Sequence, residues 1–300
     1  MIHYFAYTVT MASCPIPSKE AESESTAMPN WVELPRDITA NILQRLCTIE
    51  IVTSVRYVCP IWWHMFKDPL MWRNIRMTNL SNFPYYFSEQ MEICYYAIKQ
   101  SCGHLECISI DYFATDDLLK FISDNASNLR GLRLVNCHGI SNEGFCEAVK
   151  KLPVLETVNI SLCNFSKDSL EVVGQYCPLL TGIALVRSWL VYMVYDIHDD
   201  EAFVIAKTMV GLRYLNIQGN KMSNAGLLAI LAGCPHLEFL DIRRCYNLRL
   251  DESLKKKCID QIRNLLLPEQ TVHTFEDYCD DDRVTYSDSI IDDDCFDPYD

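Results

Sequence analysis

The chain has 300 residues, of which 49% are apolar, so it is long enough to fold as one large domain or two small ones around a sizeable core. It contains no run of about 18 uncharged apolar residues, which argues against a membrane-spanning helix. Its net charge of −14 lacks the basic excess that a nucleic-acid-binding surface requires, so no nucleic-acid partner is expected.

Residues 1–30 are expected to form a disordered leader. The first ten residues, "MIHYFAYTVT", are apolar, but they lack the basic n-region and the small-residue cleavage site of a secretory signal. The segment that starts at Met11, "MASCPIPSKEAESESTAMP", has the composition of an ordinary leader, and Met11 is an alternative start of translation. We therefore expect the folded part of the chain to begin after residue 30.

The stretch "WVELPRDITANILQRL", residues 31–46, predicts a short amphipathic helix. Pro35 pre-sets the entry into the helix, and Asp37 favours its first turn, where a negative charge complements the helix dipole. Apolar side chains then recur at helical spacing, at Ile38, Ile42, Leu43 and Leu46.

Two further helices are expected before residue 73. Thr48 is placed to cap the second helix, although the β-branched run "IEIVTSV" fits a strand equally well. Pro60 would break a continuous helix but is tolerated in the first turn of a third one, "PIWWHMF". A unit this short with this much apolar surface is a poor free-standing domain, so we expect it to bind a partner.

The body of the chain repeats the pattern apolar-x-x-apolar-x-apolar six times. The repeats begin at Leu105, Leu129, Leu155, Leu180, Leu212 and Leu237. The alternation in each repeat predicts a short strand with one buried face. Because one such unit cannot bury its own apolar surface, the units are expected to stack into a solenoid. "WRNIRMTNL", residues 72–80, has the phase of an additional unit.

Each predicted strand is followed by the signals of a helix. The residues placed to cap these helices are Thr115, Ser141, Ser166 and Ser223. The residues near which helices are expected to end are Cys102, Cys177 and Cys234. After the last repeat, "SLKKKCIDQIRNLL", residues 253–266, has helical periodicity and is predicted to be a terminal cap helix.

Six of the fifteen cysteines recur at two fixed positions of the repeat. Cys137, Cys163 and Cys245 close the strand pattern, whereas Cys102, Cys177 and Cys234 stand at the helix ends. Residues that recur once in each unit are packing residues, and no CxxC pair exists, so we expect neither a metal site nor a cofactor. Reduced, buried thiols are expected, which indicates a cytoplasmic or nuclear protein.

Two segments depart from the repeat. The unit that begins at Leu180 is longer than the others, and its excess lies in "WLVYMVYDIHDDEA", residues 189–202. This segment either packs back on the solenoid or forms an exposed recognition patch. Residues 276–300 contain eleven acidic residues and one arginine, a net charge of −10, and we expect residues 269–300 to be a disordered acidic tail.

The segments "LPRDITANILQRL" and "IEIVTSVRYVCPIWWHMFKDPLMW" together resemble the F-box. The matching positions are Leu34, Pro35, Ile38, Ile42, Leu43, Leu46, Val58, Cys59, Trp62, Asp68, Pro69 and Trp72. An F-box followed by cysteine-containing leucine-rich repeats is similar to the plant-type F-box/LRR-repeat proteins. The resemblance implies an α/β fold, with an all-helical F-box at residues 31–78. A right-handed, horseshoe-like repeat solenoid with its cap helix would follow at residues 79–268.

The same resemblance implies a role as the substrate receptor of an SCF ubiquitin ligase. The F-box would dock on a SKP-type adaptor, which connects to a cullin and a RING subunit, while the repeats would bind an unknown protein substrate. The implied adaptor-binding residues are Leu34, Pro35, Ile38, Ile42, Leu46, Ile51, Val55, Val58, Cys59 and Trp62. A repeat scaffold that is not coupled to a ligase fits the same sequence and is the alternative.

Substrate is expected on the concave side of the solenoid. Side chains alternate along a strand, so the residues between the buried ones face that side. The predicted substrate-binding residues are Arg133, Asn159, Ser161, Tyr214, Asn216, Gln218, Phe239, Asp241 and Arg243. Tyr, Phe and Arg are residue types that commonly contribute to interface energies, which favours the later repeats.

No enzymatic activity is predicted. The chain contains no GxSxG, HExxH, P-loop or GxGxxG motif. His138 follows Cys137, but Cys137 fills a repeat position, so packing explains it better than a nucleophile pair. Asp199 and Asp200 precede a helix and are interpreted as capping residues rather than metal ligands.

Overall fold

The computed structural model describes residues 34–78, 87–187 and 197–268. The chain divides into two units, Met1–Pro35 and Arg36–Asp300, and only Leu34 and Pro35 of the first unit are described. The predicted leader, most of the insertion at 189–202 and the predicted acidic tail lie outside the described residues.

In the described part of the second unit, eight parallel strands form one sheet in which the spatial order is the chain order. The strands are β1 (Asn74–Met77), β2 (Cys107–Asp111), β3 (Gly131–Val135), β4 (Thr157–Asn159), β5 (Gly182–Ala184), β6 (Tyr214–Asn216), β7 (Phe239–Asp241) and β8 (Asn264–Leu266). Each strand therefore pairs with the strand of the next unit, as stacked repeats require. The additional unit predicted at residues 72–80 contributes β1, which extends the sheet into the segment assigned to the F-box.

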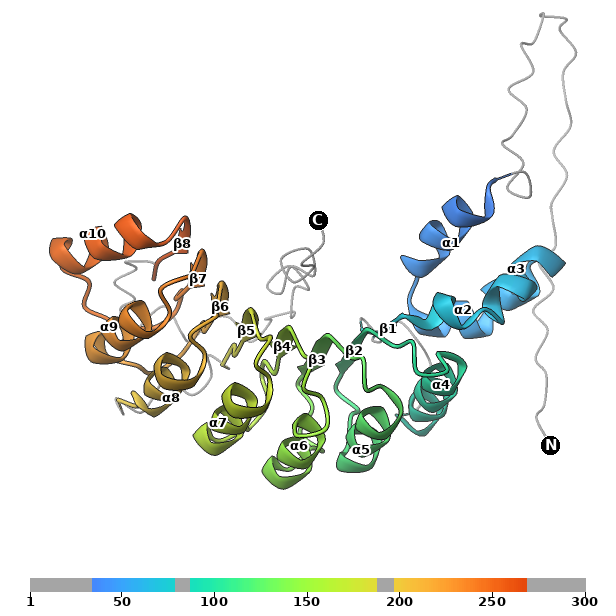
Figure 1. Ribbon diagram of the computed structural model, residues 1–300, viewed down its shortest axis with the longest axis horizontal. Coiled ribbons are helices and arrows are strands. Elements are labelled where there is room, and N and C mark those ends of the chain that lie inside the picture. The colour runs from blue at the N-terminus through green and yellow to red at the C-terminus, as the bar shows by residue number, and fades with distance from the viewer. Residues whose placement is uncertain (1–33, 79–86, 188–196, 269–300) are drawn as a thin grey trace, which may run out of the picture. The chain divides into compact units, whose positions relative to one another are not determined.

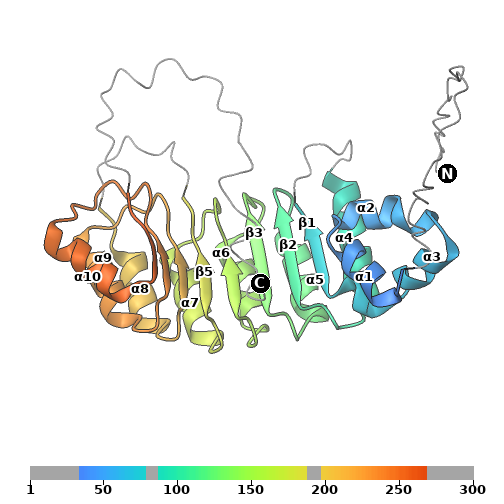
Figure 2. The ribbon, with the colours of Figure 1, turned by 90° about the horizontal axis from the view of Figure 1, so that it is seen from above.

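Helices form a second layer beside the sheet, as the two views in Figures 1 and 2 show. The helices of this layer are α4 (Phe87–Gln100), α5 (Asp116–Asn125), α6 (Asn142–Val149), α7 (Lys167–Tyr176), α8 (Asp200–Thr208), α9 (Asn224–Gly233) and α10 (Glu252–Gln261). Packed helices need 8–10 Å between their axes whereas paired strands need only about 4.8 Å. Stacking such units therefore curves the solenoid with its strands on the inner side.

One apolar residue from each unit forms a continuous row between the sheet and the helices. Leu132, Val158, Ile183, Leu215 and Leu240 are register partners in successive strands, and none of them is exposed. Burying one such side chain contributes about 1.5–3 kcal/mol, so each unit is stabilised mainly by its neighbours.

A tight turn closes each strand segment. The residues with positive φ at this turn are Tyr112 (74°), Asn136 (56°), Leu162 (57°), Gly219 (71°) and Arg244 (59°). In four of the five turns the next residue is the Cys or Asn predicted to close the repeat, and after Tyr112 it is Phe113. The thiols of Cys137, Cys163 and Cys245 donate to carbonyls of the preceding unit at 3.5, 3.4 and 3.3 Å. The structure thus confirms that these cysteines are packing residues.

Of the three cysteines predicted at helix ends, two are also buried packing residues. Cys177 and Cys234 are buried at the C-termini of α7 and α9, and their thiols donate to the carbonyls of Leu152 and Met209 at 3.8 and 3.6 Å. Cys102 differs: it has a positive φ of 48°, and its side chain is exposed. The left-handed backbone turns this thiol away from the core.

The predicted helix caps also connect neighbouring units. The hydroxyl of Ser141 accepts a hydrogen bond from the Gly144 N–H at 2.9 Å and donates to Asp116 of the preceding helix at 2.8 Å. Ser223 likewise donates to Asp199 at 2.7 Å. Asp199 occupies the N-cap of α8, but its carboxylate accepts a hydrogen bond from the Ser223 backbone N–H instead of capping its own helix. Ser166 is at the predicted cap position but makes no side-chain cap hydrogen bond.

The predicted terminal helix is shorter than expected. It ends as α10 at Gln261, and its remaining residues form β8, which pairs with β7 in parallel. The prediction of a helix over residues 253–266 was therefore wrong for the residues after Gln261. Leu265 pairs with Leu240 and packs against the core, so the segment completes another repeat instead of capping the solenoid with a helix alone.

Three short helices precede β1. They are α1 (Arg36–Gln44), α2 (Thr48–Thr53) and α3 (Pro60–Phe66), with 3-10 turns η2 (Val55–Tyr57) and η3 (Pro69–Trp72). Pro60 lies in the first turn of α3, as predicted. The alternative strand at "IEIVTSV" is wrong, because its residues form α2 and η2. The N-cap of α2 is Cys47, one residue before the predicted Thr48.

Candidate adaptor and substrate surfaces

The three N-terminal helices share a core with the first repeat. Phe66 of α3 packs edge-on against Trp72 and stacks on Tyr96 of α4, with ring centroids 5.0 and 6.0 Å apart. Trp72 is buried, and its indole N–H donates to the Phe66 carbonyl at 2.9 Å. The hydroxyl of Thr48 accepts a hydrogen bond from the Arg76 backbone N–H of β1 at 2.9 Å. These contacts attach the helices directly to the repeat body.

Large apolar side chains remain exposed over the same helices. Ile38 and Ile42 of α1 are 46% and 37% exposed, Val58 is 60% exposed, and Ile61 of α3 is 45% exposed. The other exposed apolar residues of this region are Tyr57, Trp63 and Leu70. Such a concentration of apolar surface on a short segment is characteristic of a protein-binding site.

The predicted adaptor-binding residues fall into three groups. Pro35, Ile38, Ile42 and Val58 are exposed; Leu34, Leu46, Cys59 and Trp62 are half-buried; Ile51 and Val55 are buried. Ile51 and Val55 belong to the core and present no surface to a partner, which corrects their assignment. Sequence reasoning missed Tyr57, Ile61, Trp63 and Leu70, because the helical phase alone does not reveal which side of α3 and η3 faces the repeats.

Asparagine and aspartate side chains on the strand face close the strand ends. Asn159, Asn216 and Asp241 are register partners in β4, β6 and β7, with Ala184 of β5 between them. Each accepts a hydrogen bond from the backbone N–H two residues later, at 3.0, 3.3 and 3.0 Å. A short Asx side chain suits this local turn, so these residues have a structural role.

This role corrects part of the predicted substrate site. The buried members of the predicted set are Arg133, Asn159, Ser161, Gln218 and Asp241. The Ser161 hydroxyl accepts from the Val186 N–H at 3.2 Å, and the Gln218 amide donates to Asp241 at 2.7 Å. Arg133 pairs with Asp111 of the preceding strand at 2.5 Å. These five side chains stabilise the strand face and are not available as a contact surface.

The remaining predicted residues cluster in the last repeats. Tyr214 and Phe239 are half-buried on neighbouring strands, and their rings stack with centroids 4.3 Å apart and an interplanar angle of 9°. Asn216 and Arg243 are half-buried nearby, and the Arg243 guanidinium pairs with Asp241 at 2.7 Å. A stacked aromatic pair beside an arginine that is positioned by an ion pair offers both apolar area and hydrogen-bond donors to a peptide.

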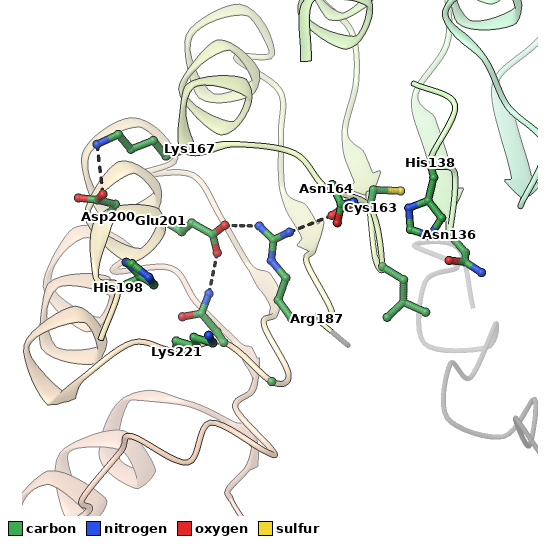
Figure 3. A pocket seen from close by; sticks show the side chains of 13 residues that line it. Asn136, His138, Cys163, Asn164, Lys167, Arg187, His198, Asp200, Glu201 and Lys221 are labelled. Atoms are coloured by element: carbon green, nitrogen blue, oxygen red, sulfur yellow. Dashed lines mark hydrogen bonds and ion pairs between the residues drawn. The ribbon is translucent and has the colours of Figure 1, made fainter. Parts of the chain in front are cut away.

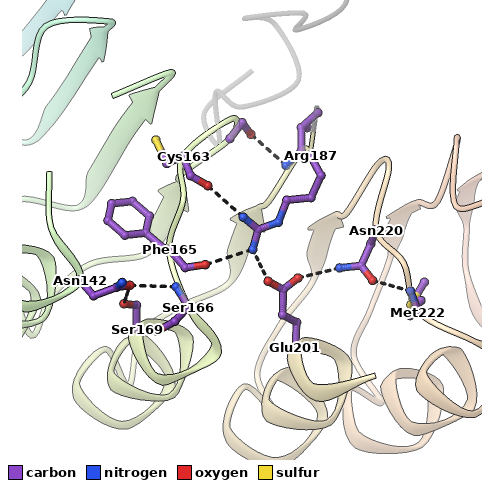
Figure 4. A network of polar contacts seen from close by, with 11 residues as sticks. Asn142, Cys163, Phe165, Ser166, Ser169, Arg187, Glu201, Asn220 and Met222 are labelled. Carbon is purple, nitrogen blue, oxygen red and sulfur yellow. Dashed lines mark hydrogen bonds and ion pairs between the residues drawn. The ribbon is translucent and has the colours of Figure 1, made fainter. Parts of the chain in front are cut away.

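A polar pocket of about 570 Å³ opens where β3 to β6 end (Figure 3). Arg187 follows β5 and lies in the wall of this pocket. Its guanidinium donates to the carbonyls of Cys163 and Phe165 at 2.9 and 3.3 Å. The same guanidinium pairs with Glu201 of α8, which also accepts a hydrogen bond from Asn220 at 2.7 Å (Figure 4). This network connects three successive units on both sides of the insertion. Sequence reasoning did not identify it, because its members are far apart in the chain.

Among the residues that the structure describes, no group of histidine, cysteine and acidic side chains could hold a metal ion. No helix in those ranges is long and apolar enough to cross a membrane.

Comparison with known proteins places the chain in a family. Residues 212–231 match the leucine-rich repeat family. The F-box protein SKIP19 of Arabidopsis thaliana is 41% identical over 294 residues, which cover 96% of this chain and 94% of that protein. The chain belongs to the plant F-box/LRR-repeat proteins. As a member of this family it is a non-catalytic protein, which agrees with the absence of catalytic motifs.

Other members differ from this F-box/LRR-repeat chain in length. Putative F-box/LRR-repeat protein 23 of Arabidopsis thaliana is 40% identical over 88% of this chain, but the match spans only 58% of that relative. Among solved structures, the complex of Rad7 and Elc1 from yeast is similar at 17% identity with a TM-score of 0.45. That match covers 61% of this chain and 49% of the other. It adds nothing to the family assignment.

Proposed function

We propose that this F-box/LRR-repeat protein is the substrate receptor of an SCF ubiquitin ligase. The observation that carries the proposal is the set of exposed apolar side chains beside the repeat solenoid, namely Ile38 and Ile42 of α1, Val58 after η2, and Ile61 of α3. In this function the surface binds a SKP-type adaptor, through which the receptor reaches a cullin and a RING subunit. The half-buried Leu46, Cys59 and Trp62 border the contact.

The strand face of the last repeats would hold the protein to be ubiquitinated. Tyr214, Phe239 and Arg243 are the residue types that contribute most to interface energies, and they remain at least partly accessible. The direct packing of α3 and η3 on the first repeat supports a fixed distance between adaptor and substrate. We place this function in the cytoplasm or the nucleus, where the many free cysteines stay reduced.

Titration of the purified full chain with a SKP-type adaptor tests the first half of the proposal. Ile42→Glu places a charge in the proposed contact, and loss of a buried apolar anchor costs about 2 kcal/mol or more, roughly thirtyfold in affinity. The matched control is Ile259→Glu on α10, where the isoleucine is 63% exposed. We expect Ile42→Glu to weaken binding at least thirtyfold, and Ile259→Glu to bind like the unchanged protein.

The alternative is a repeat scaffold without a ligase. It predicts that the chain captures its protein partner through the strand face but binds no adaptor. Absence of adaptor binding by the correctly folded full chain would favour this alternative.

A further inference from the structure

The pocket at the ends of β3 to β6 has a specific charge pattern, and we call it the rim pocket. Its lining residues are Asn136, His138, Leu162, Cys163, Asn164, Lys167, Arg187, His198, Asp200, Glu201, Gly219, Asn220 and Lys221. They come from loops that follow four successive strands and from the first turns of α7 and α8. The pocket is thus built by several units together and not by one loop.

The carboxylates of the rim pocket are neutralised from within. Asp200 pairs with Lys167 at 3.1 Å, and Glu201 accepts from both Arg187 and Asn220. Neither acid is therefore left to attract a cation. The lining holds three permanent cations and two acids, so its net charge is positive in a chain whose total charge is −14.

Hydrogen-bond donors in the rim pocket remain available. Four side chains of the pocket make no hydrogen bond or ion pair to any residue in the described ranges. They are the side chains of Lys221, His138, Asn136 and Asn164. An ammonium group, an imidazole and two amides around one cavity are suited to carboxylates, with which lysine forms charge-assisted hydrogen bonds. The chemistry favours an acidic peptide over a cation or an apolar ligand.

We propose that the rim pocket binds an acidic peptide segment, and that its occupant is the chain's own segment 276–300. This segment carries a net charge of −10, which complements the pocket. Because all eight strands are parallel, the chain leaves β8 at the edge of the sheet where the rim pocket opens. The charge and the exit edge are independent observations that indicate the same occupant.

The acidic segment is long enough to reach the rim pocket. β5, next to Arg187, is three strands from β8, a distance of about 15 Å at roughly 4.8 Å per strand. The described chain ends at Pro268, and eight further residues lead to Glu276, which an extended chain spans over about 26 Å. The contact can therefore form within one molecule. This contact between segment 276–300 and the rim pocket goes beyond the proposed receptor function. It would let segment 276–300 compete with an acidic substrate that binds beside the last repeats.

Zero-length carbodiimide coupling of the full chain tests the contact, because it joins a lysine to a carboxylate only where they touch. We expect the monomer to yield a cross-link between Lys221 and an acidic residue of 276–300. Lys150, 2.8 Å from Glu147, is the internal positive control. Lys256, exposed on α10 with no ion pair in the described ranges, is the control for random encounter. Tail cross-links found equally on Lys221 and Lys256, or only between two molecules, would overturn the proposal.

A binding measurement gives a second, independent test. A labelled peptide of residues 276–300 is titrated into full-length protein whose tail acids are replaced by their amides, so that the pocket is not self-occupied. We expect binding that weakens at least fivefold on Lys221→Glu and is unchanged on Lys256→Glu. We also expect the peptide to bind the unchanged chain more weakly than the amide variant. Equal loss with both lysine variants, or equal binding to both forms of the tail, would contradict the assignment.

Discussion

The hydroxyl of Thr48, at the start of α2, accepts a hydrogen bond from the backbone N–H of Arg76 in β1 at 2.9 Å. Thr48 is 1% exposed, so water does not replace this bond when the hydroxyl is removed. The same region is held by Trp72, whose indole donates to Phe66. The helices that carry the proposed adaptor surface are therefore joined to the repeats by buried polar bonds as well as by apolar packing.

The first prediction concerns this junction. Thr48→Val keeps the size of the side chain but leaves the Arg76 N–H without its acceptor, which typically costs about 1–3 kcal/mol. The matched control is Thr157→Val on the strand face, where the threonine side chain makes no hydrogen bond within the described ranges. Urea unfolding should show a lower midpoint for Thr48→Val only. Equal midpoints for the two variants would show that the bond contributes nothing.

The second prediction compares two cysteines that occupy the same repeat position. Cys102 is exposed, whereas Cys234 is buried with its thiol hydrogen-bonded to the Met209 carbonyl. Alkylation of the native protein, read by mass spectrometry, should label Cys102 quickly and Cys234 only after unfolding. All the described cysteines should be labelled in denaturant without a reductant. Protected pairs under those conditions would mean that disulfides exist.

Much of this fold follows from the sequence because the repeat imposes it. The leucine spacing predicts the strands, and Ser141 and Ser223 are at the predicted caps, since each unit reuses the same local chemistry. The eighth strand was not predicted, because "NLL" is too short to be distinguished from the end of α10. Periodicity predicts that Asn159 lies on the strand face, but not that its oxygen turns back to its own backbone.

The proposed sites were less predictable for a related reason. Ile51 and Val55 have the spacing of a surface stripe, and only the packing of α2 and η2 on the body shows that they are buried. The rim pocket depends on Arg187 and Glu201, which lie 14 residues apart in one long unit, and on Asn220 of the next unit. Nothing in their spacing brings them together until the units are stacked.

The third prediction is a loss of stability at alkaline pH. Burial raises the pKa of Cys177 and Cys245 from 9.0 to about 12, and that of Cys234 to about 11. Between pH 9 and these values the unfolded chain releases thiol protons that the folded chain keeps. The stabilisation that these buried thiols contribute is therefore fully present below pH 9, and it is lost as the pH rises toward 11–12.

Thermal unfolding between pH 8 and pH 11 measures this effect. Removal of one buried thiol in Cys245→Ala should make the decline in Tm with pH shallower than in the unchanged protein. Cys102→Ala, which removes an exposed thiol, should leave the decline unaltered. If both variants declined in parallel with the unchanged protein, the buried thiols would not be the cause.

The fourth prediction concerns the aromatic pair on the strand face. Replacing both Tyr214 and Phe239 by Ala removes a stacked pair of rings. Truncation of an interface hot spot costs about 2 kcal/mol or more, roughly thirtyfold in affinity. The control is Phe203→Ala on α8, where the ring is 48% exposed on the helical layer. Affinity capture should lose the substrate with the double variant only, at unchanged adaptor binding. Substrate capture that survives the double variant would place the site elsewhere.

If the chain brings a captured protein to a ubiquitin ligase, ubiquitination of that protein in cells depends on the proposed adaptor surface. Proximity labelling with stabilised ubiquitin conjugates is carried out for the full chain, for Ile42→Glu and for the matched Ile259→Glu. All three should label the same substrates, because the strand face is intact in each. We expect these substrates to be ubiquitinated with the full chain and with Ile259→Glu but not with Ile42→Glu. Substrates that are captured and ubiquitinated to the same extent with Ile42→Glu would contradict this expectation.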